Sequence, residues 1–251
     1  MKIENQQKLR DRVAIVTGGG RGIGRAIVLD FAKEGANVVA CGRNQTFLEE
    51  VSQEASRAGY FVLAVRTDVS IEGEVERMVD EAIKKFGKID ILVNNAAIGG
   101  PRGLITDISK EEWDEVLDVN LTGTFLCSKA VLKHMIKRGT GNIINVTTSK
   151  GWKRRRPGAV AYRASKSGME GFTLVLAKQM KPYGICVNAM GPATTDTDMQ
   201  KNMPLAQKRR WRMWKPDEVS KLAVFLALQT VDTLTGASID FPQWQKSLRG
   251  S

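Results

Sequence analysis

An apolar run, a cluster of glycines and an amphipathic stretch follow one another near the start of the chain. The apolar run at 12–17 predicts a buried parallel strand, and Ile23, Ile27 and Phe31 recur at helical spacing after the glycines. Glycines let the backbone approach a phosphate closely, and the free amides and dipole of a helix N-terminus hold its charge. A second apolar run at 37–41 completes a β-α-β unit, which favours a dinucleotide-binding fold.

The same alternation of strands and helices continues over most of the 251 residues. Further strands are expected at 60–65, 89–93, 141–146, 184–189 and, most weakly, near 237–240. Helical stretches lie at 49–58, 71–86, 111–137 and 162–181, and another begins at Pro216. This rhythm predicts an α/β fold: a single Rossmann-type doubly wound parallel sheet of about seven strands with helices on both faces. We expect one domain over 1–251, with a core at 12–240 and a substrate-side segment at 198–215.

Composition narrows the setting in which this chain works. No apolar run approaches the roughly 18 residues that a membrane span needs, and the first twelve residues lack an apolar signal-peptide core. Cys41, Cys127 and Cys186 stand in apolar or helical surroundings without metal-ligand spacing, which favours buried free thiols. The single histidine, His134, excludes a histidine-cluster metal site. We therefore expect a cytoplasmic protein with no metal and no membrane partner.

The end of the second expected strand bears on the choice of cofactor. Enzymes that choose NAD usually place a carboxylate here for the ribose 2′-hydroxyl, but the sequence runs Gly42-Arg43-Asn44. Arg43, joined by Arg21 of the glycine cluster, suits a 2′-phosphate because a guanidinium matches phosphate oxygens in a fork. We expect NADP(H) rather than NAD(H). The alternative is that both arginines are exposed and bind no ligand. A titration with NADPH and NADH distinguishes the two possibilities.

Tyr162 and Lys166 stand four residues apart at the start of an expected helix, so their side chains share one face. A neighbouring ammonium favours phenolate and would lower the pKa of the tyrosine from about 10 toward the range of an acid-base catalyst. Asn120 lies in an otherwise apolar helical run, where an amide costs free energy unless it finds partners. Hydroxyls at 147–149 follow the fifth strand, where they could either form a turn or bind a carbonyl oxygen.

Together these stretches resemble the classical short-chain dehydrogenase/reductase family, over the chain from about Arg12 to Asp240. The shared motifs, in the family's order, are Thr17-Gly18-x-x-x-Gly22-Ile23-Gly24, Asp68-Val69, Asn94-Asn95-Ala96, Asn120, the hydroxyls before Tyr162, and Tyr162-x-x-x-Lys166. Each motif is weak alone, but their joint order is specific.

The resemblance implies a role for each matching residue. Tyr162 would exchange a proton with the carbonyl oxygen, and Lys166 would lower the pKa of Tyr162 and bind the ribose hydroxyls. Ser149 would hold the carbonyl, and Asn120 would anchor a water that leads protons to Lys166. The residues implied in cofactor contacts are Gly18, Arg21, Gly22, Ile23, Gly24, Asp68, Val69, Asn94, Pro192, Thr195 and Thr197.

Four departures from the family pattern limit this transfer. Ala97 and Ala193 stand where the family usually has glycine, and their methyl groups are expected to narrow the space beside the nicotinamide. The serine is uncertain by one place, because Thr148 could align in the role of Ser149. The segment 238–242 lacks the family's usual glycine pair, which bears on subunit packing. The resemblance nevertheless implies a homo-oligomer, a dimer or tetramer built partly from helices 111–137 and 162–181.

Basic residues concentrate in two segments that the resemblance places beside the substrate. Residues 150–166 hold seven Lys and Arg and residues 200–215 hold six, with no acid in either segment. Positive charge at a pocket mouth attracts anions, so we expect an anionic or carrier-linked, 3-oxoacyl-like carbonyl substrate. Trp152, Trp211 and Trp214 could wall an apolar pocket or stack on guanidinium groups. The alternative is a pair of solvated loops with tryptophans packed beneath them.

The sequence thus predicts an oxidoreductase that transfers a hydride between NADP(H) and a carbonyl or alcohol, with Tyr162 as proton donor or acceptor. A first alternative is an NADP-dependent alcohol or sugar dehydrogenase working in the oxidative direction. A second is an NADP-sensing binding protein without catalysis, since basic runs with tryptophan also suit nucleic acid. The short basic runs and the retained Tyr162, Lys166 and Asn120 argue against a nucleic-acid partner.

Overall fold

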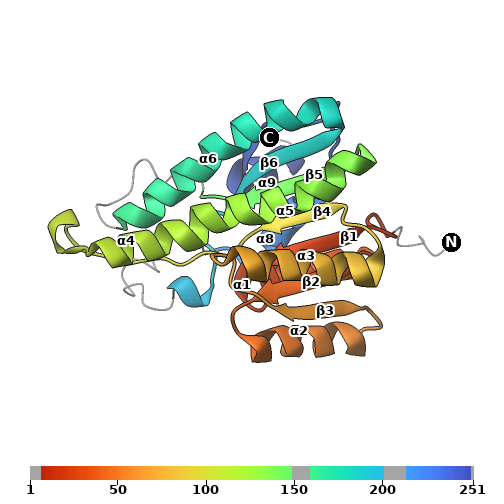
Figure 1. Ribbon diagram of the computed structural model, residues 1–251, viewed down its shortest axis with the longest axis horizontal. Helices are drawn as coiled ribbons and strands as arrows, with labels where there is room; N and C mark the ends of the chain where they lie inside the picture. The colour runs from red at the N-terminus through yellow and green to blue at the C-terminus, as the bar shows by residue number, and fades with distance from the viewer. Residues whose placement is uncertain (1–6, 149–158, 201–212, 250–251) are drawn as a thin grey trace.

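The structure, a computed structural model, describes residues 7–148, 159–200 and 213–249. Within these residues seven strands form one parallel sheet in the order β3-β2-β1-β4-β5-β6-β7 (Figure 1). The strands are β1 Val13–Thr17, β2 Asn37–Gly42, β3 Val62–Arg66, β4 Ile91–Asn94, β5 Gly141–Val146, β6 Ile185–Gly191 and β7 Ser238–Asp240. The doubly wound parallel sheet expected from the sequence is confirmed.

Helices cover both faces of the sheet. The α-helices are α1 Gly22–Lys33, α2 Gln45–Arg57, α3 Glu72–Phe86, α4 Lys110–Leu117, α5 Gly123–Arg138, α6 Val160–Met180, α8 Pro216–Ala227 and α9 Phe241–Leu248. The shorter helical turns are η1 Ile105–Asp107, η2 Asp118–Thr122, η4 Lys181–Tyr183 and η5 Asp198–Gln200. No helix among the described residues is long and apolar enough to cross a bilayer.

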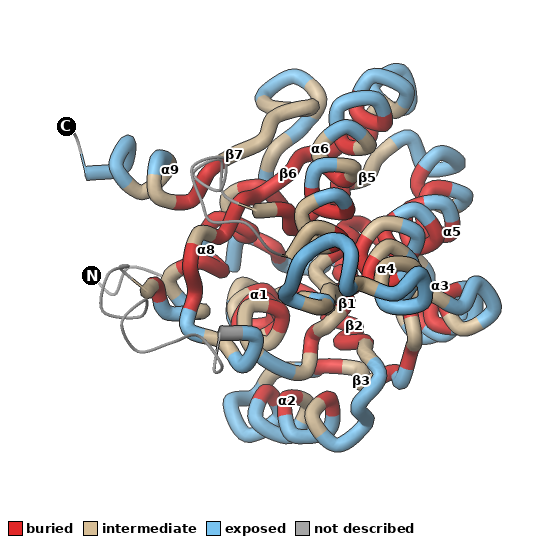
Figure 2. The backbone as a smooth tube through the Cα atoms, turned by 90° about the vertical axis from the view of Figure 1, so that its left-hand side faces the viewer, coloured by how far each residue is buried: buried red, intermediate tan, exposed pale blue. Residues whose placement is uncertain are grey.

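Two apolar cores hold these layers together. One core packs α1, α2 and α8 against one face of the sheet, and the other packs α3, α5 and α6 against the opposite face. Figure 2 shows the result: the strands and the inner sides of the helices are buried, while the outer sides are exposed. The central strands read as continuous apolar runs because both of their faces are covered.

The strand order reverses beside β1, and this reversal positions the site. The chain first moves from β1 to β2 and β3, and then crosses back to place β4 on the other side of β1. Loops that leave β1 and β4 therefore diverge at the carboxyl edge of the sheet and leave a crevice there. Val16 pairs with Ala40 on one side and with Val93 on the other, so all three strands end at a similar level.

The bounds of several expected elements differ from those observed: α2 begins at Gln45 rather than at 49, and β4 covers Ile91–Asn94 rather than 89–93. The third strand covers Val62–Arg66 rather than 60–65, because Tyr60 and Phe61 lie in the connection between α2 and β3, where the Tyr60 amide bonds to Ala55 O. The helix expected at 111–137 is three pieces, since a π-helical segment, Asp118–Thr122, separates α4 from α5. Such single-turn π segments occur frequently at functional sites, and this one contains Asn120.

Candidate active site

A cavity of about 530 Å³ opens at the carboxyl edge of the sheet. Its walls come from the turns after β1, β2, β3 and β4, from the first turn of α6, and from the segment after β6. The predicted residues that line it are Gly18, Arg21, Gly22, Ile23, Gly24, Arg43, Asp68, Val69, Tyr162, Lys166, Pro192 and Thr197. Folding thus brings most of the expected site residues to one cavity.

The glycine turn after β1 is fixed by a residue that sequence reasoning did not select. Gly18 adopts a φ of +64°, and a Cβ at Gly24 would collide with the Gly18 carbonyl oxygen. Asn95 donates from Nδ2 to Thr17 O at 2.9 Å and to Gly18 O at 3.2 Å. The hydroxyl of Thr17 accepts bonds from the backbone amides of Asn95 and Ala96, both at 2.9 Å. The ends of β1 and β4 are therefore joined directly beneath the turn.

One end of the cavity is basic. Arg21 and Arg43 line it with exposed side chains. Arg21 Nη1 lies 3.6 Å from Asp198 Oδ2, and its guanidinium stands 5.9 Å from the centroid of the Phe47 ring. Asn44 begins α2 by accepting a hydrogen bond from the Phe47 amide at 3.1 Å. Arg43 thus lies on the capped turn between β2 and α2, while Arg21 lies on the glycine turn at the start of α1.

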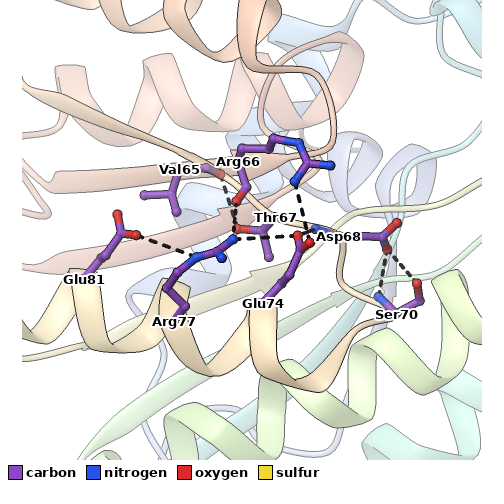
Figure 3. A network of polar contacts seen from close by, with 8 residues as sticks. All are labelled: Val65, Arg66, Thr67, Asp68, Ser70, Glu74, Arg77 and Glu81. Atoms are coloured by element: carbon purple, nitrogen blue, oxygen red, sulfur yellow. Dashed lines mark hydrogen bonds and ion pairs between the residues drawn. The ribbon is translucent and has the colours of Figure 1, made fainter.

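Asp68 is anchored at the rim by the polar network of Figure 3. Its Oδ1 accepts bonds from Ser70 N at 3.0 Å and from Ser70 Oγ at 2.6 Å, and its own amide donates to Glu74 Oε2 at 2.7 Å. Burial raises the pKa of Asp68, but the Ser70 bonds and the nearby cations Arg43 and Arg66 outweigh it, so the pKa is lowered overall. Asp68 is therefore a fixed carboxylate at neutral pH.

Tyr162 and Lys166 both lie in the first turns of α6 and both line the cavity. Lys166 Nζ donates to Val146 O at 2.7 Å and lies 3.4 Å from Met169 Sδ. The same nitrogen is 5.9 Å from the centroid of the Tyr162 ring. The i, i+4 spacing therefore places the phenol and the amine on one face, as expected.

The expected lowering of the Tyr162 pKa is wrong for this geometry. Burial raises the pKa of Tyr162 to about 12. Burial also lowers the pKa of Lys166 from 10.5 to about 7, because the charged amine loses its hydration while it contacts the uncharged Val146 O and Met169 Sδ. Desolvation of both groups therefore outweighs the attraction between phenolate and ammonium on which the expectation rested.

Asn120, Asn94 and Thr195 lie behind the cavity wall rather than on it. Asn120 Oδ1 accepts a bond from Ile98 N at 2.8 Å, and its Nδ2 donates to Ile98 O and to Ser165 Oγ, both at 3.0 Å. This amide therefore joins the loop after β4 to α6, which satisfies the buried polar group noted in the sequence.

The other two side chains support neighbouring elements. Asn94 Nδ2 donates to Ser128 Oγ at 3.1 Å and to Asn145 Oδ1 at 2.8 Å, which links β4 to α5 and β5. Thr195 Oγ1 donates to Pro192 O at 3.1 Å and closes the turn after β6. Both residues thus shape the cavity without lining it.

Of the three hydroxyl residues after β5, the structure describes Thr147 and Thr148. Ser149 lies outside the described residues, and so do Trp152 and Trp211. Thr148 is half-buried and is not part of the cavity lining, whereas Thr147 lines it. Thr147 Oγ1 donates to Glu170 Oε1 of α6 at 2.5 Å.

Ala97, Ala193 and Trp214 differ in whether they line the cavity. Ala97 lines the cavity, as its sequence position suggests, but Ala193 packs against the core beneath the sheet edge. Trp214 is not among the residues that line the cavity. It is buried edge-on against Phe241, with ring centroids 5.0 Å apart.

Several lining residues were given no cofactor or catalytic role from the sequence, although Asn95 and Ala96 belong to a quoted motif and Thr147 to the hydroxyls after the fifth strand. They are Gly20, Gly42, Asn44, Phe47, Leu48, Thr67, Asn95, Ala96, Ile98, Gly99, Val119, Val146, Thr147, Asp198 and Met199. Asn95 had a signal, since it adjoins Asn94 at the carboxyl end of a buried strand. The apolar residues, such as Phe47 and Met199, carried none, because nothing local distinguishes a cavity wall from a core.

Comparisons with known proteins match this geometry. A sequence model of the family described as short chain dehydrogenase matches residues 12–208. The chain is 39% identical over 229 residues to a 3-oxoacyl-[acyl-carrier-protein] reductase of Synechocystis sp., covering 87% of this chain and 90% of the relative. It is 35% identical over 246 residues to glucose 1-dehydrogenase 2 of Bacillus subtilis, covering 92% and 93%.

A solved structure agrees with these sequence relatives. The 3-ketoacyl-(acyl-carrier-protein) reductase from Brucella melitensis, complexed with NADH, superposes with a TM-score of 0.85 at 34% identity, covering 92% of this chain and 97% of that one. Sequence, fold and cavity agree, and the chain belongs to the short-chain dehydrogenase family of oxidoreductases.

Proposed function

We propose that this protein transfers a hydride between NADP(H) and a carbonyl or alcohol substrate, with Tyr162 as proton donor or acceptor. The observation that carries the proposal is the cavity itself. It joins a glycine turn at a helix N-terminus to a phenol and a buried amine on one face of α6. Residues 1–251, with their core at 12–240, are proposed to act as one dinucleotide-binding and catalytic domain.

The residues present fit a dinucleotide. Gly18 and Gly24 let the turn after β1 pack closely on itself and on Asn95, and the first turn of α1 has no acidic residue to oppose a phosphate. Free amides at such a helix start bind anions. Arg21 and Arg43 add positive charge at the same end of the cavity, which supports NADP(H) over NAD(H). The Brucella relative is complexed with NADH, so a direct titration of both cofactors is the appropriate test.

When bound, the cofactor supplies the hydride, and the protein supplies position and proton. The raised pKa of Tyr162, about 12, keeps its hydroxyl protonated at neutral pH, which suits donation to a carbonyl oxygen. Lys166, whose pKa is about 7, can hold or release a proton near neutral pH one helical turn away. A hydroxyl from Ser149 or Thr148 would orient the carbonyl oxygen, and alanine substitution at each position identifies which one.

Replacement of Tyr162 by phenylalanine tests the proposed chemistry. We expect the Tyr162→Phe variant to remain folded and to bind NADPH, but to lose at least about 100-fold in kcat, the usual contribution of a positioned acid or base. The assay follows NADPH consumption with a panel of carbonyl compounds. A matched control is Tyr183→Phe, since Tyr183 is exposed and lies outside the cavity lining. Undiminished ketone turnover by the Tyr162 variant would overturn the proposal.

The substrate class is proposed as an anionic or carrier-linked carbonyl of the 3-oxoacyl type. The basic runs at 150–166 and 200–215 support it, although most of both runs lies outside the described residues. The Synechocystis and Brucella relatives are named as reductases of acyl groups on a carrier protein. Rising salt should lower kcat/KM for charged substrates more than for neutral ones. An identical response would refute electrostatic capture of the substrate.

A second candidate is an alcohol or sugar dehydrogenase that works in the oxidative direction. The observation that favours it is the glucose 1-dehydrogenase 2 of Bacillus subtilis, similar over 92% of this chain. Oxidation requires Tyr162 to accept a proton, which its raised pKa opposes at neutral pH. Turnover of sugars with NADP⁺ that exceeds turnover of 3-oxoacyl compounds with NADPH would favour this candidate.

A further inference from the structure

Four aromatic rings pack together at the β7 edge of the molecule. Trp214 and Phe241 meet edge-on with centroids 5.0 Å apart, and Phe241 lies 6.0 Å from Trp244. Trp244 in turn lies 5.6 Å from Phe225 of α8. Phe241 is fully buried although it is the first residue of the C-terminal helix α9. Figure 2 shows α9 following β7 at the side of the molecule where α8 and β6 also lie.

The backbone of Trp214 is bonded to the segment that follows β6, which carries part of the cavity wall. Its amide donates to Thr194 O at 2.9 Å, and its carbonyl accepts from the Asp196 amide at 2.9 Å. These two bonds form an isolated parallel bridge between Trp214 and Thr195. The bridged segment continues to Thr197, which lines the cavity. A short path of contacts therefore leads from α9 through two rings to residues that face the cavity.

Near its start, the segment after β6 contains a residue with an unfavourable backbone conformation. Ala193 adopts a φ of +62°, a left-handed conformation that favours glycine over alanine. Such a residue persists only when its surroundings hold it in place. The segment after β6 therefore depends on contacts from elsewhere, and Ala193 itself packs against the core cluster that contains Trp214 and Phe241.

We propose that α9, through Phe241 and Trp214, positions the wall formed by residues 192–198 and so sets the affinity of the cavity for its nucleotide. The inference rests on the proposed function only in taking that nucleotide as the ligand. Pairing of Gly191 with Asp240 brings the ends of β6 and β7 together, so α9 begins beside the segment that it supports. Phe241 and Trp214 are positioning residues, since neither lines the cavity.

The test compares Phe241→Leu with Phe225→Leu. Each variant removes one ring from the same cluster, but only Phe241 contacts Trp214. We expect Phe241→Leu to raise the Kd for NADPH about 3- to 10-fold, with kcat at saturating NADPH nearly unchanged. In the free protein, hydrogen exchange at the Asp196 amide should accelerate, while exchange in β1 stays the same. Phe225→Leu should leave both the Kd and the Asp196 exchange at wild-type values.

Other outcomes would overturn the proposal. One is that Phe241→Leu leaves both the Asp196 exchange rate and the Kd for NADPH at wild-type values. The other is that Phe225→Leu changes both quantities as much as Phe241→Leu does. If Phe241→Leu does not fold, Trp214→Leu replaces it and must raise both the Kd and the Asp196 exchange rate. Trp214→Phe keeps a ring at this position, so both quantities must lie closer to wild-type values than in Trp214→Leu. Absence of nucleotide binding by the wild-type protein would instead refute the proposed function. The exchange comparison would still decide whether α9 holds the wall.

Discussion

Lys166 lines the cavity, and burial of its amine lowers the stability of the fold. Its side chain is 2% exposed, and its amine is bonded to the uncharged Val146 carbonyl at 2.7 Å. The pKa falls to about 7 in the folded protein, against about 10.4 in an unfolded chain. Below pH 7 both states carry the proton, so the full cost of burying the charge applies. Between pH 7 and 10 the unfolded chain binds more protons, so stability rises with pH.

Substitution of Lys166 by methionine should therefore stabilise the fold while abolishing turnover. We expect the variant to exceed the wild type by roughly 2–4 kcal/mol in the free energy of unfolding at pH 7. The difference should shrink as the pH rises above 7 and should vanish only above about 10.4, where the wild-type amine is neutral in both states. Denaturant unfolding at several pH values measures it, with Lys178→Met on the exposed side of the same helix as control. A difference that does not change with pH would contradict the buried-charge explanation.

Arg43 is the residue on which the proposed cofactor choice depends. It lines the cavity at the end of β2, where no carboxylate stands to bind a ribose 2′-hydroxyl. Arg43→Ala should weaken NADPH binding about 10- to 100-fold, the scale of a lost charged hydrogen bond, and leave NADH binding nearly unchanged. Calorimetric titration of both cofactors measures this, with Arg57→Ala at the far end of α2 as control. Equal or tighter binding of NADH by the wild type would end the proposal.

Among the elements, the turn between β1 and α1 depends on the loop after β4. Asn95 reaches across with two bonds to backbone carbonyls, Thr17 O and Gly18 O. The conformation of the glycine turn is thus decided jointly by the ends of two strands that lie more than seventy residues apart in the chain. In the same way Asn120, in the π-helical segment, joins the Ile98 backbone to Ser165 of α6.

Asn95→Ala should loosen the glycine turn. Loss of its two bonds to carbonyls should cost about 1–3 kcal/mol of stability and should weaken nucleotide binding, because the amides of the turn lose their fixed orientation. Denaturant unfolding and nucleotide titration measure the two effects. Asn95→Asp is the matched variant, since it keeps the shape but cannot donate from the ionised carboxylate. A variant with reduced stability but unchanged nucleotide affinity would show that the turn is organised without Asn95.

At the scale of the whole molecule, α5 and α6 lie side by side in Figure 1, and both helices have exposed apolar side chains. Leu174 and Val175 of α6 are 50% and 58% exposed, and Phe125 of α5 is 47% exposed. Apolar groups gathered on neighbouring helices are typical of a protein interface. We propose that these helices form part of a contact between copies of this chain, as a dimer or a tetramer.

Val175→Arg should shift the protein toward smaller species, because a charge buried in an apolar interface without a partner is costly. Sedimentation velocity measures the distribution of species at several protein concentrations. Ile71→Arg is the control, since Ile71 is similarly exposed at 49% but precedes α3. A wild-type protein that sediments as a monomer, or a variant that sediments like the wild type, would refute this interface.

Much of the fold could be predicted because its signals are local. Apolar runs placed the strands, and helical spacing placed α1, α3 and α6 to within a few residues. The π-helical break at Asp118–Thr122 was missed, because the apolar pattern of the sequence continues through it. The start of β3 was also missed, since Tyr60 and Phe61 favour a strand by composition yet lie in the connection before it.

By itself the sequence determined the alternation of strands and helices, the glycine turn, and the shared face of Tyr162 and Lys166. These follow from chain periodicity and from the absence of a side chain on glycine, which are properties of neighbouring residues. Only the tertiary structure decided the pKa of Tyr162, the support of the turn by Asn95, and the burial of Trp214 against Phe241. Desolvation and long-range contacts depend on which distant segments meet, and no short stretch of sequence contains that information.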